Sequence, residues 1–179
     1  MRRPMILFCI VTLAAVAAAR AAGNPETGAA AAAARPAAPG KLDIIKKLAG
    51  DWVEVGEDGT PTGKEVSYRV TAGGSAVEET LFAGTDHEMI TMYYLEGGDL
   101  ALTHYCVLGN QPHMKAEKQA DPTKLVFKCV GGTNLKSEND EHMHHATIVW
   151  RDDGHIRSEW QEFKDGKNVM TATFNLARK

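Results

Sequence analysis

The sequence lacks the features that assign a chain to several common functional classes. It contains no Ser-His-Asp motif, no phosphate-binding loop and no dinucleotide-binding fingerprint. It also contains no polybasic run and no amphipathic helix of the kind that binds a membrane surface. The formal net charge is −3 at pH 7, whereas nucleic-acid-binding proteins present basic surfaces. We therefore expect neither nucleic acid nor a membrane surface among its partners.

The N-terminus has the pattern of a secretory signal. Arg2 and Arg3 precede an apolar run from Met5 to Ala19, and the small residues at 17–19 and 19–21 offer cleavage sites. The run is about 15 residues long, shorter than the roughly 20 residues that a transmembrane helix needs. We predict a signal peptide over residues 1–21, no stable membrane insertion after its cleavage, and a periplasmic or secreted protein. An uncleaved membrane anchor is the alternative.

Residues 22–40 have almost nothing to bury in a core. They contain three prolines and six consecutive alanines from Ala29 to Ala34. This composition predicts a disordered Ala/Pro-rich linker. The folded unit is then a single domain over residues 41–179, which is long enough for one hydrophobic core. Without the three arginines of residues 1–21, 17 basic residues remain against 23 acidic ones, a net charge of −6.

From about residue 50 onward, apolar and polar residues alternate, as in a sheet with one buried face. The clearest runs are 66–70, 100–108, 125–129, 144–150, 156–160 and 170–176. Turn residues separate them about every 10–15 residues, so hairpins join neighbouring strands. No helical pattern lies between the strands, which excludes parallel βαβ units. We predict an all-β fold, an up-and-down antiparallel β-barrel of nine or ten strands that follows a short N-terminal helix over Lys41–Leu48. Closure of the barrel removes unpaired edges.

The start of this strand series resembles that of lipocalin-type barrels. Gly50-Asp51-Trp52 matches their Gly-x-Trp motif, in which the tryptophan plugs one barrel end and a basic residue near the C-terminus packs on it. Arg178 is the matching position, and guanidinium groups are attracted to tryptophan faces. Two longer segments, 73–116 and 143–167, resemble a bacterial lipocalin-like family of unassigned function. The resemblance covers about residues 42–179 and implies a calycin-type β-barrel, but no activity.

Strand parity places histidine and cysteine on the inward face of the predicted barrel. His104 and Cys106 share the parity of the leucines of their strand, and His144 shares that of Ile148. His104 then has three alternative roles. It is a core histidine hydrogen-bonded to a neighbour, a polar contact to a ligand, or, together with Cys106 and His144, a ligand of zinc or haem iron.

The function we predict is the binding of a small, mostly apolar molecule in the barrel lumen. The predicted ligand-binding residues combine aromatic walls with a few polar contacts: His104, Cys106, Phe127, His144, Trp150, Ser158, Trp160 and Phe174. The sequence favours a binding protein over an enzyme, and it predicts no catalytic residue, no metal and no cofactor. Two alternatives remain. One is a haem- or zinc-binding barrel with redox or isomerase activity, and the other is an interaction barrel without a ligand.

The two cysteines of the folded unit are predicted to stay unpaired. A strand over about residues 114–119 separates the strands of Cys106 and Cys129. Next-nearest strands lie about 9.6 Å apart, whereas a disulfide needs Cα atoms within about 7 Å. We therefore expect two free, buried thiols.

Two further patterns lie on the strands before residue 100. Glu78 and Glu79, with residues 86–88, form an acidic stretch that we interpret as a solvated edge. Adjacent strand residues face opposite sides, so these two glutamates cannot form an acid–base pair. The strands over 77–82 and 89–95 are apolar on both faces. This predicts cover by the N-terminal helix or by a second subunit in a homodimer, with ordinary scatter as the alternative.

Overall fold

The computed structural model describes residues 40–152 and 154–179. The predicted signal peptide and nearly all of the predicted linker lie outside the described residues. Among those described, no helix is both long enough and apolar enough to cross a membrane.

Ten antiparallel strands form one closed barrel in sequence order. A single turn of helix, α1 (Asp43–Lys46), precedes them, and a short 3-10 helix, η1 (Ala72–Gly74), connects the second and third strands. The strands are β1 (Gly50–Val55), β2 (Pro61–Thr71), β3 (Ala76–Leu81), β4 (Met89–Glu96), β5 (Asp99–Tyr105), β6 (Gln111–Ala116), β7 (Lys124–Thr133), β8 (His142–Asp152), β9 (His155–Lys164) and β10 (Lys167–Arg178). The prediction of an all-β, up-and-down antiparallel barrel with a short N-terminal helix is confirmed.

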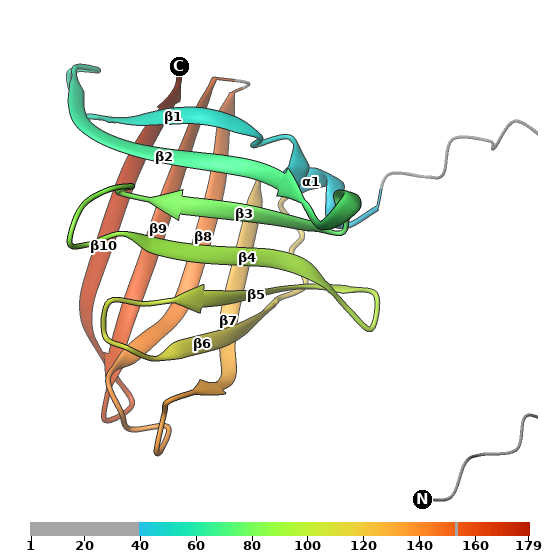
Figure 1. Ribbon diagram of the computed structural model, residues 1–179, viewed down its shortest axis with the longest axis vertical. Helices are drawn as coiled ribbons and strands as arrows, with labels where there is room; N and C mark the ends of the chain where they lie inside the picture. Colours follow the sequence, from blue (N-terminus) through green and yellow to red (C-terminus); the bar gives the residue numbers. More distant parts are fainter. Residues whose placement is uncertain (1–39, 153) are drawn as a thin grey trace, which may run out of the picture. The chain divides into compact units, whose positions relative to one another are not determined.

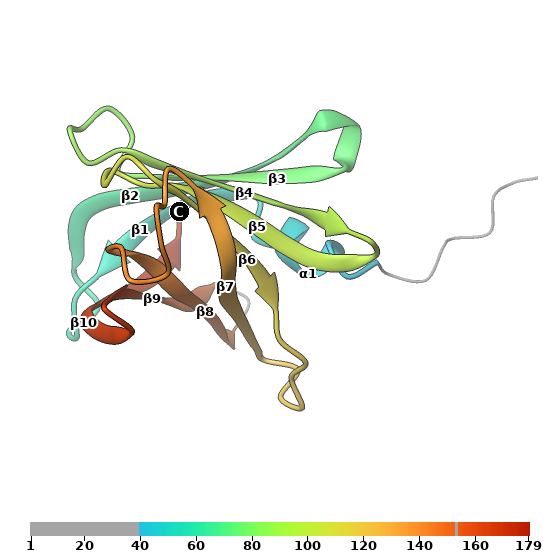
Figure 2. The ribbon, with the colours of Figure 1, turned by 90° about the horizontal axis from the view of Figure 1, so that it is seen from below.

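The barrel closes between its first and last strands. β1 pairs with β10 through Trp52 and Arg178, Val53 and Ala177, and Glu54 and Leu176. Figure 1 shows β1–β6 running across the front of the barrel, while β7–β10 cross behind them. Seen from below, the two groups of strands meet around one interior (Figure 2).

The end of the barrel next to α1 is closed by packing on Trp52. The tryptophan is buried, and its indole N–H donates to Leu48 O at 2.8 Å. Arg178 covers the indole face, with its Cζ 4.4 Å from the ring centroid. The same guanidinium donates to Lys47 O and Ala49 O, both at 2.8 Å. The pairing of Arg178 with Trp52 that the lipocalin resemblance implied is therefore present.

The middle of the lumen is filled by the chain's own side chains. Large apolar residues from strands on opposite walls are almost completely buried there, namely Leu102, Met114, Phe127, Ile148 and Ile156. Space for a ligand therefore has to lie toward the end opposite α1, where the β3–β4, β5–β6, β7–β8 and β9–β10 connections gather (Figure 1).

Two β-bulges interrupt the alternation where β7 ends and β8 begins; a further register shift on β8, between Trp150 and Asp152, lies at its other end. The β6–β7 register shifts between His113 and Met114, which leaves Val130 as an extra residue of β7. The β8–β9 register shifts between Met143 and His145, which leaves His144 as an extra residue of β8. A bulge re-aims the side chains next to it, so strand parity fails at this level of the barrel.

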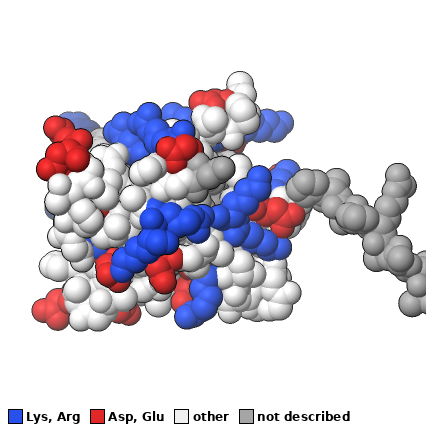
Figure 3. Space-filling view, turned by 90° about the horizontal axis from the view of Figure 1, so that it is seen from above, with Lys and Arg blue, Asp and Glu red and all other residues white. Residues whose placement is uncertain are grey.

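Charged side chains of both signs share the surface. Figure 3 shows a band of lysine and arginine side chains with acidic side chains beside it. Several exposed charges are paired, such as Lys115 with Glu96 at 2.7 Å and Lys164 with Glu141 at 3.0 Å. Exposed pairs of this kind add little to stability.

Candidate functional site

A small apolar cavity lies at the end of the lumen that α1 does not close. Its volume is about 220 Å³, and its deep wall includes Leu81, His104, Met143 and Trp160. The lining also reaches outward to the connections after β3 and β5. The cavity therefore joins the barrel interior to the open end.

The mouth of the cavity carries exposed apolar side chains. Val107, Leu108 and Met170 line the cavity, yet each exposes more than two fifths of its surface. A wider hollow of about 580 Å³ lies next to it and shares Phe82, His87 and Phe174. This arrangement gives an apolar molecule a path from solvent to the lumen.

His104 lies on the cavity wall with one ring nitrogen unpartnered. It is 2% exposed, and its Nδ1 lies 2.9 Å from the Thr91 hydroxyl oxygen. Its Nε2 is buried and has no hydrogen-bond partner. Burial lowers the pKa of His104 from 6.5 to about 4, so the imidazole is neutral near pH 7.

Trp160 supplies a second unpartnered polar atom beside His104. The two rings pack with their centroids 4.5 Å apart. The Trp160 Nε1–H is buried and has no acceptor. An unsatisfied buried donor is costly in a protein interior, which makes this pair of atoms a candidate ligand contact.

Glu79 is fully buried and stands behind His104 in a chain of hydrogen bonds. Its carboxyl accepts from Tyr68 OH at 2.6 Å and from Tyr93 OH at 2.8 Å. Burial raises the pKa of Glu79, while hydrogen bonds from Tyr68, Tyr93 and Thr91 oppose that rise. The prediction that Glu79 lies on a solvated edge is therefore wrong, because its inward parity on β3 outweighs its charge once hydroxyl donors surround it.

The eight predicted ligand-binding residues lie in different environments. Four of them line the cavity at the open end: His104, Cys106, Trp160 and Phe174. Phe127 and Ser158 are buried, and Phe127 packs edge-on against Tyr93 at 5.7 Å. Trp150 is half-buried against the core, and its backbone N–H donates to Thr123 O.

His144 lies apart from this cavity, in contrast to the parity prediction. The bulge in β8 makes Met143 the partner of Glu162, and Met143 lines the lumen cavity in its place. His144 instead stacks on Phe163, with the ring centroids 4.5 Å apart. Burial, followed by the charges of His145, His142 and Lys128, lowers the pKa of His144 to about 4. The predicted combination of His104, Cys106 and His144 as metal ligands is not assembled among the described residues.

Both cysteines of the described residues are free thiols, as predicted. Cys106 is buried, whereas Cys129 is only half-buried. Burial raises the pKa of both thiols. A protonated thiol is a poor nucleophile, so this environment favours a packing role for Cys106.

Glu162 is a cavity residue that the prediction missed. It is buried, and it shares the inward parity of Ser158 and Trp160 on β9, which is the signal that identifies it. Burial, together with a hydrogen bond to Glu141, raises the pKa of Glu162, while the pKa of Glu141 is lowered. The cavity therefore has one acidic group at its rim that favours a proton.

The comparisons with known proteins add no function. No family model matches the sequence, and no curated protein matches it. The closed barrel is established by its strand pairing, and the candidate site has to be interpreted from its own chemistry.

Proposed function

We propose that this barrel binds a small, neutral, mostly apolar molecule that carries one polar group. The observation that supports the proposal is that His104 and Trp160, which line a mostly apolar cavity, each carry a buried polar atom without a hydrogen-bond partner, Nε2 and Nε1 respectively. Ligand pockets commonly have this pattern of apolar walls with a few orienting polar groups.

The cavity volume limits the size of the ligand. A cavity of about 150 Å³ binds benzene, whereas pockets for drug-sized molecules have about 300–1,000 Å³. The observed 220 Å³ therefore suits a molecule with one ring or a short chain. A longer tail would have to extend into the neighbouring hollow beside Phe82 and Phe174.

The hydrogen bonds that link Glu79, Thr91 and His104 determine which polar group the ligand should carry. Thr91 donates toward Glu79, so its oxygen accepts from His104 Nδ1–H, and His104 Nε2 presents a lone pair. Trp160 Nε1–H is a donor only. A hydroxyl group can donate to His104 Nε2 and accept from Trp160 Nε1–H, so phenols and alcohols fit. An anion fits less well, because an apolar wall cannot compensate a buried charge.

The cellular location of the protein and its grouping with other barrels are part of the same proposal. We place the protein in the periplasm or outside the cell, on the basis of its N-terminal signal pattern. We group it with the bacterial lipocalin-like barrels that its sequence resembles, with which the closed ten-strand barrel is compatible. The homodimer and the haem or zinc alternatives stay predictions from the sequence.

Calorimetric titration with phenol, toluene and benzoate tests the proposal. Phenol should bind about 30- to 150-fold more tightly than toluene, since each of its two hydrogen bonds contributes about 1–1.5 kcal/mol. Benzoate should bind weakest. In Trp160→Phe the ring remains and one of the two hydrogen bonds is lost, so the preference for phenol over toluene should fall to about tenfold, the contribution of the remaining bond to His104.

Trp150→Phe is the matched control, because Trp150 is half-buried and does not line this cavity. It should keep the preference for phenol. Binding of none of the three probes, or equal affinities for phenol and toluene in the unmodified protein, would contradict the proposed function.

A further inference from the structure

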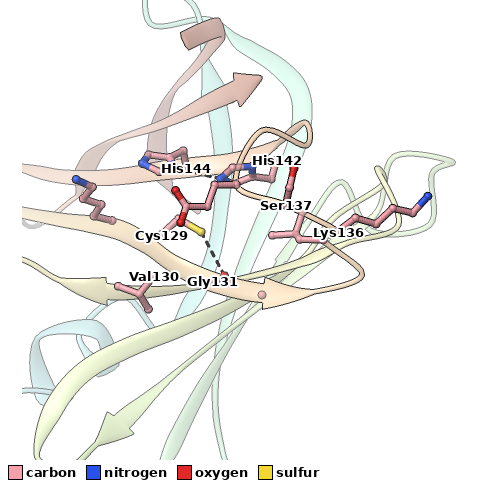
Figure 4. Close-up of a pocket in the computed structure, with 11 residues that line it drawn as sticks. Cys129, Val130, Gly131, Lys136, Ser137, His142 and His144 are labelled. Atoms are coloured by element: carbon pink, nitrogen blue, oxygen red, sulfur yellow. Dashed lines mark hydrogen bonds between the residues drawn. The ribbon is translucent and has the colours of Figure 1, made fainter. Parts of the chain in front are cut away.

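A second group of polar side chains lies outside the lumen cavity, where β7 and β8 leave the barrel core. Cys129 Sγ and one ring nitrogen each from His142 and His144 all lie within 4.8 Å of one another. The residues line a pocket of about 430 Å³ under the β7–β8 connection. Figure 4 shows Cys129 on one strand facing the two histidines on the next.

The two bulges bring these three side chains together. His144 is itself the extra residue of β8, and Val130, next to Cys129, is the extra residue of β7. Across the β8 bulge, the ring nitrogens His142 Nε2 and His144 Nδ1 lie 3.0 Å apart. Each of the two strands is therefore distorted at the position where it contributes to the group.

His142 is held in the orientation and tautomer of a metal ligand. Its Nδ1–H donates to Asp140 O at 2.6 Å, so its Nε2 lone pair points to the group. The Asp140 side chain fixes the connection by accepting from Lys136 N at 2.6 Å and from Ser137 Oγ at 3.2 Å. Metal-binding histidines commonly donate their second ring N–H to a carbonyl or carboxylate in this way.

We propose that Cys129 Sγ, His142 Nε2 and His144 Nδ1 bind one zinc ion. Zinc–sulfur bonds of about 2.3 Å and zinc–nitrogen bonds of about 2.0–2.1 Å place tetrahedral ligand atoms about 3.3–3.6 Å apart. To reach that geometry, His142 Nε2 and His144 Nδ1, which lie 3.0 Å apart, separate by about 0.3 Å, and the Cys129 side chain, whose thiol donates to Gly131 O at 3.2 Å, rotates toward them. On binding, the thiol loses its proton, and the His144 proton moves to Nε2.

Zinc fits this group better than a blue-copper centre. Blue-copper sites combine two histidines and a cysteine with a weak axial methionine. The nearest methionine along the chain, Met143, lines the lumen cavity instead. Zinc accepts three protein ligands and keeps a fourth position for water or a small anion. Lys128, Lys136 and Glu138 line the same pocket, so its charged side chains are net positive and favour an anion at that position.

Cobalt substitution and metal analysis of the purified full-length protein, kept reduced with a phosphine, test this site. After dialysis against zinc and then buffer, we expect one zinc per chain. Cobalt(II) should give a thiolate-to-cobalt charge-transfer band together with intense tetrahedral d–d bands. Cys129→Ser and His144→Gln should each lose at least about 100-fold in zinc affinity, more than the 10–100-fold of an outer-shell change.

Cys106→Ser and His155→Gln are the matched controls, since one removes the lumen thiol and the other an exposed histidine. Both should keep full zinc affinity and the cobalt spectrum. Near-ultraviolet circular dichroism identifies any variant that fails to fold, and His142→Gln then replaces it. Less than a tenth of an equivalent of zinc, a cobalt spectrum without the thiolate band, or loss of binding in Cys106→Ser would overturn the proposal. Phenol binding in the lumen should be unchanged in Cys129→Ser, so this site and the proposed function are tested separately.

Discussion

Individual polar residues define both candidate sites of this barrel, buried in the lumen and partly buried between β7 and β8. In the lumen, Glu79 organises Tyr68, Tyr93 and Thr91, and Thr91 in turn orients His104. A network of this kind is stabilising only while every member keeps its partners. The lumen therefore combines a satisfied polar chain with two unpartnered atoms at its end.

The free energy of unfolding should fall as the pH is lowered from about 6.5 to about 4. His104 has a pKa of about 4 in the folded protein and an ordinary value of 6.5. Between these values the unfolded chain binds a proton that the folded protein does not, so stability is complete above pH 6.5 and is lost as the pH falls. At about 1.4 kcal/mol per pKa unit, the effect reaches about 3 kcal/mol.

Urea unfolding of the unmodified protein and of His104→Gln at a series of pH values measures this effect. The variant lacks the titrating group, so its stability should depend less steeply on pH in this range. Glu79, whose pKa is raised, contributes with the opposite sign in both proteins and cancels in the comparison. Identical pH dependences would rule out the buried, neutral His104.

Glu79→Leu should destabilise the fold by about 2–5 kcal/mol. The substitution leaves the hydroxyls of Tyr68 and Tyr93 buried without their acceptor, and each unsatisfied group costs about 1–3 kcal/mol. Glu78→Leu is the matched control on the neighbouring residue, because it removes only an ion pair with the exposed Arg69 and should cost less than about 1 kcal/mol. Urea midpoints at constant m-value decide between the two outcomes.

At the level of elements, alternation in the sequence predicts most of the strands and the closed meander. Alternation does not predict a bulge, because the sequence does not show which strand residue lacks a partner on the neighbouring strand. That unpaired residue reverses the faces of the residues beyond it. The assignment of His144 to the lumen failed for that reason, and Met143 lies there instead. The charge of Glu79 predicts exposure whereas its parity on β3 places it inside, and the hydroxyls that satisfy it come from β2 and β4, which the sequence of β3 does not show.

The helix α1 depends on Arg178 for its position. A single turn is too short to be stable alone, and the guanidinium donates to Lys47 O and Ala49 O while it covers Trp52. Arg178→Lys cannot reproduce this fork of donors. We expect the substitution to lower the free energy of unfolding by about 1–3 kcal/mol. It should also accelerate amide exchange more in α1 than in the strands. Arg69→Lys, at an exposed ion pair, should change stability by less than about 0.5 kcal/mol.

For the whole molecule, closure of the barrel depends on its last four residues. Every backbone pairing between β1 and β10 involves Leu176, Ala177 or Arg178. Deletion of residues 176–179 should therefore open the barrel, expose two strand edges and promote aggregation. Size-exclusion chromatography and urea unfolding should show loss of the elution peak of the intact protein and of the cooperative transition. A C-terminal extension of four serines should leave both unchanged.

The pairing of β1 with β10 also determines when the barrel can close during synthesis of the chain. The chain is synthesised from β1 toward β10, so one edge of β1 has no partner until the final residues become available. The partners Trp52 and Arg178 are far apart in sequence, and such contacts form slowly because a long loop must close first. A nascent chain therefore keeps an open barrel until β10 has been synthesised, and the barrel closes only when β10 can pair with β1.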